Sequence, residues 1–189
     1  MAKPRILVFA GSVRTGAFSQ KLAALVAKEL LLLDAEASLI SLSDYPMPIY
    51  DADAEARDGA PENARKLRRV LLAHRGVFIA TPEYNASTPP LLKNAIDWVS
   101  RAKESADPFK GRYFAIGSTS NGRLGGYRAL IALRQVLELG LGALVLPEQV
   151  AVSEAATAFD DNGALKDGRV ADFLRASLRR LIALAESEL

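Results

Sequence analysis

A short loop near the amino end of the chain carries the residue types that bind phosphate. The apolar run 6–10 ends at Gly11, and a loop with hydroxyl groups and glycine follows, before a helix expected from about residue 19. Free backbone N–H groups and the partial positive charge at the amino end of a helix favour an anion. The hydroxyl groups of Ser12 and Ser19 and the guanidinium of Arg14 add donors. We interpret this loop as a phosphate site; alternatively, the serines only cap the helix and Arg14 is a solvated charge.

The loop lacks the sequence patterns of two common nucleotide sites. It has no Gly-Lys-Ser/Thr ending, which nucleoside triphosphate loops use, and no Gly-x-Gly-x-x-Gly pattern, which dinucleotide sites use. We therefore expect neither a triphosphate nor the pyrophosphate of a tightly held dinucleotide.

Two further loops offer groups that suit a flat ring. Pro82, Glu83, Tyr84 and Asn85 combine a rigid turn, an aromatic face and an amide that both donates and accepts. The glycine-rich loop at 119–126 lets backbone approach a flat ligand closely. A phosphate at one end and a planar ring at the other describe a mononucleotide with a large ring system. The alternative is an ordinary turn with a partly buried tyrosine.

The elements that must position these loops alternate along the chain. Short unbroken apolar runs predict buried parallel strands, and apolar stripes at helical spacing predict helices. We expect strands at about 5–10, 35–42, 76–80, 113–118 and 143–150, and helices at about 19–33, from 61, 88–101, 127–139 and 167–187, with Thr88 as a cap. Residues 45–50 form a loop, and the acidic stretch 51–59 is expected to be mobile. The pattern predicts a five-stranded parallel sheet covered by helices on both faces, with the three loops at its carboxyl edge.

Composition limits the classes of function. The chain has 189 residues, which we interpret as one domain covering 1–189, and its net charge of +2 comes from scattered charges that do not suggest nucleic-acid binding. It has no cysteine, which excludes disulfides and thiolate chemistry. We find neither a signal-peptide pattern nor an apolar stretch long enough to cross a membrane. The sequence therefore predicts a cytoplasmic protein.

Taken together, these residues resemble the NAD(P)H-dependent FMN reductases of flavodoxin-like fold, a family that includes chromate- and quinone-reducing flavoproteins. The resemblance is carried by Gly-Ser-Val-Arg at 11–14, by Thr-Pro-Glu-Tyr-Asn at 81–85 and by Leu-Lys-Asn-Ala-Ile-Asp-Trp at 92–98. Further matches are the glycine pair at 125–126 and Leu-Arg at 133–134. The matches follow the family's order over nearly the whole chain, and the blocks at 81–85 and 92–98 are highly specific.

The resemblance implies a cofactor site and a reaction. It implies a three-layer flavodoxin-like fold with strand order 2-1-3-4-5. The phosphate of FMN is then held by Ser12, Arg14 and Ser19, and its ring is framed by Pro82, Glu83, Tyr84 and Asn85 and met by Thr119 and Ser120. NADPH or NADH passes hydride to the flavin, and a small-molecule acceptor takes two electrons: a quinone, free flavin, azo compound or metal oxyanion. It also implies a homodimer or homotetramer built through the helix that bears 93–98.

Two positions depart from the family's pattern. Relatives often have Ser where this chain has Ala17, and Asn where it has Ser19. A missing hydroxyl at position 17 removes a phosphate contact of about 1.5–3 kcal/mol, which is roughly a ten- to hundredfold weaker hold on FMN. We therefore expect FMN to be lost easily during purification.

We assign no catalytic acid or base and no metal site. His74, the only histidine, has no nucleophile or ligand set nearby in the sequence and is interpreted as structural. Asp97 and Trp98 are assigned to packing, and the acidic residues between 44 and 55 do not have a metal-ligand spacing. Arg123 and Arg128 either bind a phosphate of the nicotinamide dinucleotide or are charges exposed to solvent.

Two other classes of function stay open. A flavodoxin-like electron carrier shuttles single electrons between proteins, but such carriers are usually acidic, whereas this chain is near neutral. An interaction module would keep the fold without redox chemistry, and the intact turn at 82–85 argues against it.

Overall fold

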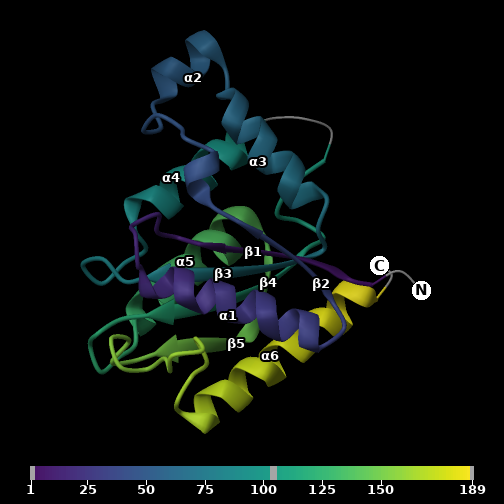
Figure 1. The fold of residues 1–189 in the computed structure, drawn as a ribbon. Helices are drawn as coiled ribbons and strands as arrows, with labels where there is room; N and C mark the ends of the chain where they lie inside the picture. Colours follow the sequence, from purple (N-terminus) through teal and green to yellow (C-terminus); the bar gives the residue numbers. More distant parts are fainter. Residues whose placement is uncertain (1–2, 103–105, 188–189) are drawn as a thin grey trace.

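The computed structural model describes residues 3–102 and 106–187, and strands and helices alternate along it (Figure 1). The strands are β1 (Arg5–Ala10), β2 (Glu36–Ile40), β3 (Gly76–Pro82), β4 (Tyr113–Thr119) and β5 (Leu144–Val152). The α-helices are α1 (Phe18–Leu32), α2 (Ala52–Asp58), α3 (Glu62–Leu72), α4 (Pro90–Arg101), α5 (Tyr127–Gln135) and α6 (Gly168–Glu186). A 3-10 turn (Leu42–Asp44) follows β2, and a π-helical turn (Val136–Gly140) extends α5.

The five strands form one parallel sheet in the order β2-β1-β3-β4-β5, which confirms the expected fold. The register brings the strand ends together at one edge. Ala10 pairs with Ala80, and Pro82 pairs with Thr119. The loops that follow β1, β3 and β4 therefore leave the same edge of the sheet, as the sequence predicts.

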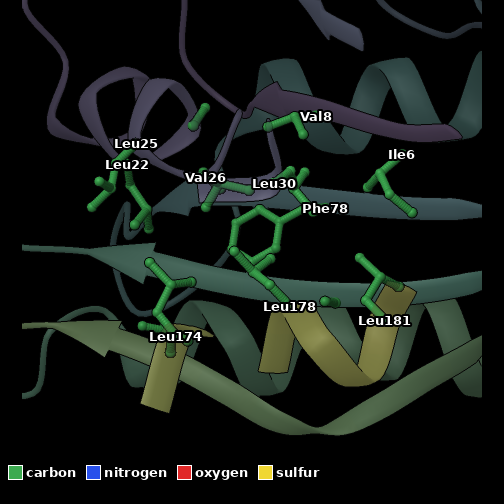
Figure 2. Packing of buried hydrophobic residues seen from close by; sticks show 14 of the residues in the cluster. Ile6, Val8, Leu22, Leu25, Val26, Leu30, Phe78, Leu174, Leu178 and Leu181 are labelled. Atoms are coloured by element: carbon green, nitrogen blue, oxygen red, sulfur yellow. The ribbon is translucent and has the colours of Figure 1, made fainter. Parts of the chain in front are cut away.

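One face of the sheet is covered by α1 and α6, and the other by α3, α4 and α5 (Figure 1). Phe78 lies at the centre of the first layer, between Leu22 and Val26 of α1 and Leu178 of α6 (Figure 2). Its ring is fully buried, and it needs glycine on the next strand, since a Cβ at Gly117 would lie 2.9 Å from Phe78 Cζ. Burial of such a side chain stabilises the fold by about 1.5–3 kcal/mol.

Residues 51–59 are not the mobile stretch that we expected. They form α2, whose amino end is capped by Asp51: its carboxylate accepts from the N–H groups of Asp53 (2.8 Å) and Ala54 (3.1 Å). None of the residues of α2 is buried, so the sequence has no apolar stripe to reveal the helix. The capping residue Asp51 is the one local signal in the sequence that indicates this helix.

The last strand is longer and less regular than predicted. Phe114 pairs with Val145 but Ile116 pairs with Gln149, so two extra residues of β5 bulge out. Arg134 stabilises the bulge by donating to the carbonyls of Val145 (3.4 Å) and Leu146 (2.5 Å). The Leu-Arg match at 133–134 thus has a structural role.

Candidate functional site

The loop after β1 is fixed to the start of α4. The N–H of Gly11 donates to the carbonyl of Ala80 (2.8 Å), and a Cβ at Gly11 would lie 3.0 Å from Leu92 Cδ2 and 3.4 Å from Pro89 Cγ. Gln20, one turn into α1, donates from Nε2 to the carbonyl of Ser12 (3.1 Å). The sequence pattern did not single out Gln20, because its only signal was an amide within reach of the loop.

The amino end of α1 has no counter-charge. Its N-cap is Ala17, which makes no side-chain hydrogen bond, and no acidic residue lies in the first turn. Ser12 Oγ instead accepts from the N–H of Arg14 (3.3 Å), and Ser19 Oγ is fully buried without a partner among the described residues. The alternative that these serines cap the helix is therefore wrong, and the hydrogen-bonding capacity of the Ser19 hydroxyl is unused among the described residues, beside a helix end that favours an anion.

The other helices show how unusual this is. The amino ends of α2 and α6 are capped by Asp51 and Asp167, and α3 has Glu62 in its first turn. The amino end of α5 has an acidic partner in Glu83, which accepts from the N–H of Arg128. Among the α-helices of the described ranges, only α1 and α4 therefore lack both a side-chain cap and a nearby acidic residue. The expected cap from Thr88 is wrong: α4 starts at Pro90 after Pro89, so its first residue has no N–H to offer. This leaves α1 as the better anion site.

Arg14 is exposed beside this helix end. Its guanidinium makes one long contact to the carbonyl of Thr15 (3.4 Å), and no carboxylate pairs with it within the described parts of the chain. The predicted phosphate ligands Ser12, Arg14 and Ser19 therefore lie on one loop and helix turn. Their contact with phosphate remains a prediction.

The loop after β3 is a tight turn that presents Tyr84. Tyr84 and Ser87 exchange two backbone hydrogen bonds of 3.0 Å each. Between them, Asn85 (φ 48°) and Ala86 (φ 63°) both have left-handed backbone, as in a type I′ turn. The Tyr84 side chain is 45% exposed, so its aromatic face is available to a ligand.

Glu83 turns away from this exposed surface and caps α5. Its side chain is only 7% exposed, and its carboxylate accepts from the backbone N–H of Arg128 (3.1 Å), from Arg128 Nε (2.8 Å) and from the guanidinium Nη2. The hydrogen bonds from Arg128 are the main reason that the pKa of Glu83 lies below its ordinary value. The structure shows Glu83 holding the turn to α5; its predicted place beside a ring stays a prediction.

The loop after β4 is closed by two glycines. Gly125 (φ 59°) and Gly126 (φ 85°) adopt backbone that favours glycine, and a Cβ on either would come within 3 Å of neighbouring atoms. Ser118 Oγ donates to the carbonyl of Gly125 (2.7 Å), and the N–H of Ser120 donates to Val152 (3.1 Å). Thr119 Oγ1 is buried without a partner among the described atoms, a second unsatisfied hydroxyl at this edge.

The other residues considered from the sequence have structural contacts. His74 is buried, with Nδ1 2.7 Å from the carbonyl of Val70 and Nε2 2.7 Å from Ser38 Oγ. Burial is the main cause that lowers the pKa of His74. Asp97 pairs with Lys93 (2.8 Å) on α4.

Arg128 is occupied by Glu83, whereas Arg123 is exposed. No cluster of possible metal ligands occurs within residues 3–102 and 106–187. Within the same ranges, no helix has the length and apolar character needed to cross a membrane.

Trp98 and Asn94 hold the loop at 45–50 in place. Trp98 Nε1 and Asn94 Nδ2 each donate to the carbonyl of Pro48 at 2.8 Å, and Asn94 Oδ1 accepts from the N–H of Tyr50 (2.8 Å). Trp98 is buried and meets the Tyr50 ring edge to face. The motif at 92–98 thus fixes a loop whose Ile49 side chain is 87% exposed.

Comparison with known proteins agrees with this geometry. Residues 4–157 match the family model described as NADPH-dependent FMN reductase. The chain is 38% identical over 179 residues to an NAD(P)H-dependent FMN reductase of Pseudomonas aeruginosa, covering 94% of this chain and 92% of that protein. It is 37% identical over 144 residues to a quinone reductase of Escherichia coli, covering 76% and 74% of the two chains.

A solved structure has the same fold. It is FerB, described as a flavoenzyme NAD(P)H:(acceptor) oxidoreductase, from Paracoccus denitrificans. The match has a TM-score of 0.80 and 29% identity, and it covers 97% of each chain.

Proposed function

The chain belongs to the NADPH-dependent FMN reductase family, and from this premise we propose that it uses NAD(P)H and bound FMN to reduce a quinone by two electrons. The oxidoreductase class and the cofactor follow from the family. The acceptor, the residue assignments, the assembly and the location in the cell form the proposal.

The observation that carries the assignment of the cofactor site is the amino end of α1. Among the described residues, the buried Ser19 hydroxyl has no partner, the first turn of α1 has no acidic residue, and the Arg14 guanidinium pairs with no carboxylate. Together these groups suit a dianionic phosphate. The residues therefore fit the phosphate of FMN. We assign Ser12, Arg14 and Ser19 to it.

In this reaction the residues of the chain bind FMN and orient it. FMN, when bound, supplies the hydride-accepting and electron-donating chemistry, so the protein need not move a proton itself. Pro82, Tyr84 and Asn85 frame the ring, Thr119 and Ser120 meet it from the next loop, and Glu83 fixes the turn by its bonds to Arg128.

The surface beside these loops favours a flat apolar acceptor. Tyr84 is 45% exposed, and Leu124 and Tyr127 of the neighbouring loop and helix are also exposed. The names of the related quinone reductases support the same acceptor class.

An absorbance titration tests the proposal. Purified protein at high concentration is mixed with one equivalent of FMN, so that the flavin stays bound, and NADPH or NADH is then added without oxygen. We expect the flavin absorbance to bleach in one two-electron step and to return when a benzoquinone is added. Failure to retain FMN even at high concentration contradicts the proposal. A flavin that NADPH and NADH do not bleach, but that dithionite reduces in two separate one-electron steps, supports the electron carrier instead.

We propose further that two copies of the chain assemble through α4 and the loop at 45–50. The support is the exposed Ile49 side chain on a loop that Asn94 and Trp98 bond to, since both residues belong to the block at 92–98 that carries the family resemblance. Light scattering should give a multiple of 20.3 kDa, and Ile49→Asp should reduce the mass to one chain. Leu31→Asp, at an exposed site on α1, is the control. A wild-type mass near 20.3 kDa contradicts this assembly.

Since the proposed reaction consumes NAD(P)H, we also propose a cytoplasmic location. Cell fractionation followed by immunoblotting tests it. Recovery with the membrane pellet or in the culture medium would contradict this part of the proposal.

A further inference from the structure

A turn at the tip of the loop after β4 presents an arginine to solvent. The N–H of Gly125 donates to the carbonyl of Gly122 (3.0 Å), so Arg123 and Leu124 are the two central residues of a four-residue turn. Both side chains are exposed. The Arg123 guanidinium makes no hydrogen bond and no ion pair with the residues that the structure describes. Its charge is therefore available to an anionic ligand.

The backbone that carries Arg123 is fixed by the end of β5 and the loop after it. The N–H of Ser120 donates to the carbonyl of Val152 (3.1 Å). One residue further on, Asn121 Oδ1 accepts from the N–H of Ala156 (3.0 Å). Binding of a ligand at Arg123 therefore orders one side chain rather than a whole loop, which keeps the entropic cost of binding low.

The neighbouring cations are already paired with carboxylates. The segments 83–101 and 120–135, all of which the structure describes, hold the loops after β3 and β4 and the helices α4 and α5. Their other cations form four ion pairs: Lys93 with Asp97, Arg101 with Glu55, Arg128 with Glu83 and Arg134 with Glu138. In these two segments only Arg123 has a charge without a partner among the described residues.

Arg123 and the proposed phosphate site lie on opposite sides of the ring loops. The strand order β1-β3-β4 places the turn of Tyr84 between the first loop and the loop of Arg123. Arg14, on the first loop, is assigned to the phosphate of FMN, so an anion at Arg123 is a different one. Leu124 and Tyr127, both exposed, give this second anion site an apolar border.

We propose that Arg123 binds the pyrophosphate of the hydride donor. The inference rests on the proposed function, in which the nicotinamide must reach the flavin ring. One ribose separates the pyrophosphate from the nicotinamide, whereas the 2′-phosphate of NADPH lies further away, on the adenosine ribose. Arg123 follows Ser120, which is assigned to the ring, by three positions, so the nearer phosphates suit it better. A guanidinium fork matches phosphate oxygens, and NADH and NADPH share this pyrophosphate, so Arg123 should serve both donors equally.

Calorimetric titration with NAD⁺ and NADP⁺ measures binding without a redox reaction. The protein, at high concentration, holds one equivalent of FMN. We expect Arg123→Gln to raise the dissociation constants of both dinucleotides about tenfold or more. Arg123→Lys keeps the charge but loses the fork, so it should recover only part of the affinity. Arg179→Gln, at an exposed position of α6 on the other face of the sheet, makes the same charge change and should leave both constants unchanged.

Stopped-flow measurement of flavin bleaching without oxygen separates binding from hydride transfer. Arg123→Gln should need about tenfold more NADH or NADPH for the half-maximal rate, with the limiting rate unchanged. The inference is overturned if NAD⁺ does not bind wild type or if Arg123→Gln binds both dinucleotides as wild type does. It is also overturned if only NADP⁺ binding weakens, which would assign Arg123 to the 2′-phosphate.

The same measurements distinguish this failure from failure of the proposed function. A wild-type protein that binds no FMN, or whose flavin neither donor bleaches, overturns the proposed function and the inference with it. Equal bleaching of wild type and Arg123→Gln at every donor concentration overturns the inference alone.

Discussion

The carboxylate of Glu83 accepts hydrogen bonds from both the backbone and the side chain of Arg128, 45 residues further along the chain. These bonds join the turn after β3 to the amino end of α5. They also place a negative charge where the helix carries a partial positive charge. One buried carboxylate thus stabilises α5 and fixes the position of Tyr84 at the proposed site.

Glu83→Gln should therefore destabilise the fold. We expect the free energy of unfolding, measured by urea at pH 7, to fall by about 1.5–3 kcal/mol, the contribution of hydrogen bonds to a charged group. Because the folded-state pKa of Glu83 is lowered, its contribution is present above about pH 4.5 and is lost as the pH falls through the folded-state value. The difference in the free energy of unfolding between wild type and Glu83→Gln should therefore shrink as the pH falls below about 4.5.

Asp97→Asn supplies a matched control for this pair. It removes the exposed Lys93–Asp97 ion pair on α4, which we expect to contribute only about 0.5 kcal/mol or less. Equal effects of the two substitutions would contradict the anchoring role of Glu83.

Ser19→Ala should change protein stability and FMN affinity in opposite directions. The Ser19 hydroxyl is buried without a partner in the described structure, so its removal should stabilise the FMN-free protein by about 1 kcal/mol. If the hydroxyl binds phosphate, FMN should bind about tenfold more weakly. Thermal unfolding of the FMN-free protein and fluorescence titration with FMN measure the two effects. Unchanged FMN affinity would remove Ser19 from the site.

Ala17→Ser should act on the same helix end in the other direction. A serine at the N-cap of α1 supplies the hydroxyl that the family's pattern has there, and we expect roughly ten- to hundredfold tighter FMN binding. Ser177→Ala is the control, since its hydroxyl is also buried without a described partner but lies on α6. It should leave FMN affinity unchanged.

Ala86→Gly should stabilise the turn that carries Tyr84. Ala86 has a φ of 63°, which costs a residue with a Cβ about 1–2 kcal/mol, while glycine loses about 0.5–1 kcal/mol more in chain entropy. We expect a net gain of about 0.5–1 kcal/mol in the free energy of unfolding. Ala56→Gly, on the exposed helix α2, should lose about 1 kcal/mol. A loss at both positions would show that Ala86 is not strained.

The sequence was sufficient for the sheet because each buried strand is an unbroken apolar run. Ile6 to Ala10 and Val77 to Ala80 could be read directly, and the parallel order then placed three loops at one edge. The Glu83–Arg128 bonds could not be predicted, because they join residues that only the folded sheet brings together. The absence of a cap on α1 was equally hidden, because position 19 carries serine, a residue type that commonly caps helices.

His74 should make the free energy of unfolding depend on pH near and below about 6.5, the ordinary pKa of a histidine. It is the only histidine in the chain, so this dependence can be assigned to one side chain. The carbonyl of Val70 can only accept, so Nδ1 carries the proton of the neutral ring and Nε2 accepts from Ser38. Burial lowers the folded-state pKa of His74 below its ordinary value of about 6.5. The unfolded chain therefore takes up a proton first as the pH falls.

It follows that stability is fully present above about pH 6.5 and is lost as the pH falls from there through the lowered folded-state pKa of His74. Urea unfolding between pH 8 and pH 5 should show this loss in wild type, and His74→Gln should flatten the curve. Ser38→Ala removes the donor to Nε2, so it should raise the folded-state pKa of His74 and weaken the pH dependence. An unchanged pH profile in His74→Gln would assign the effect to other groups.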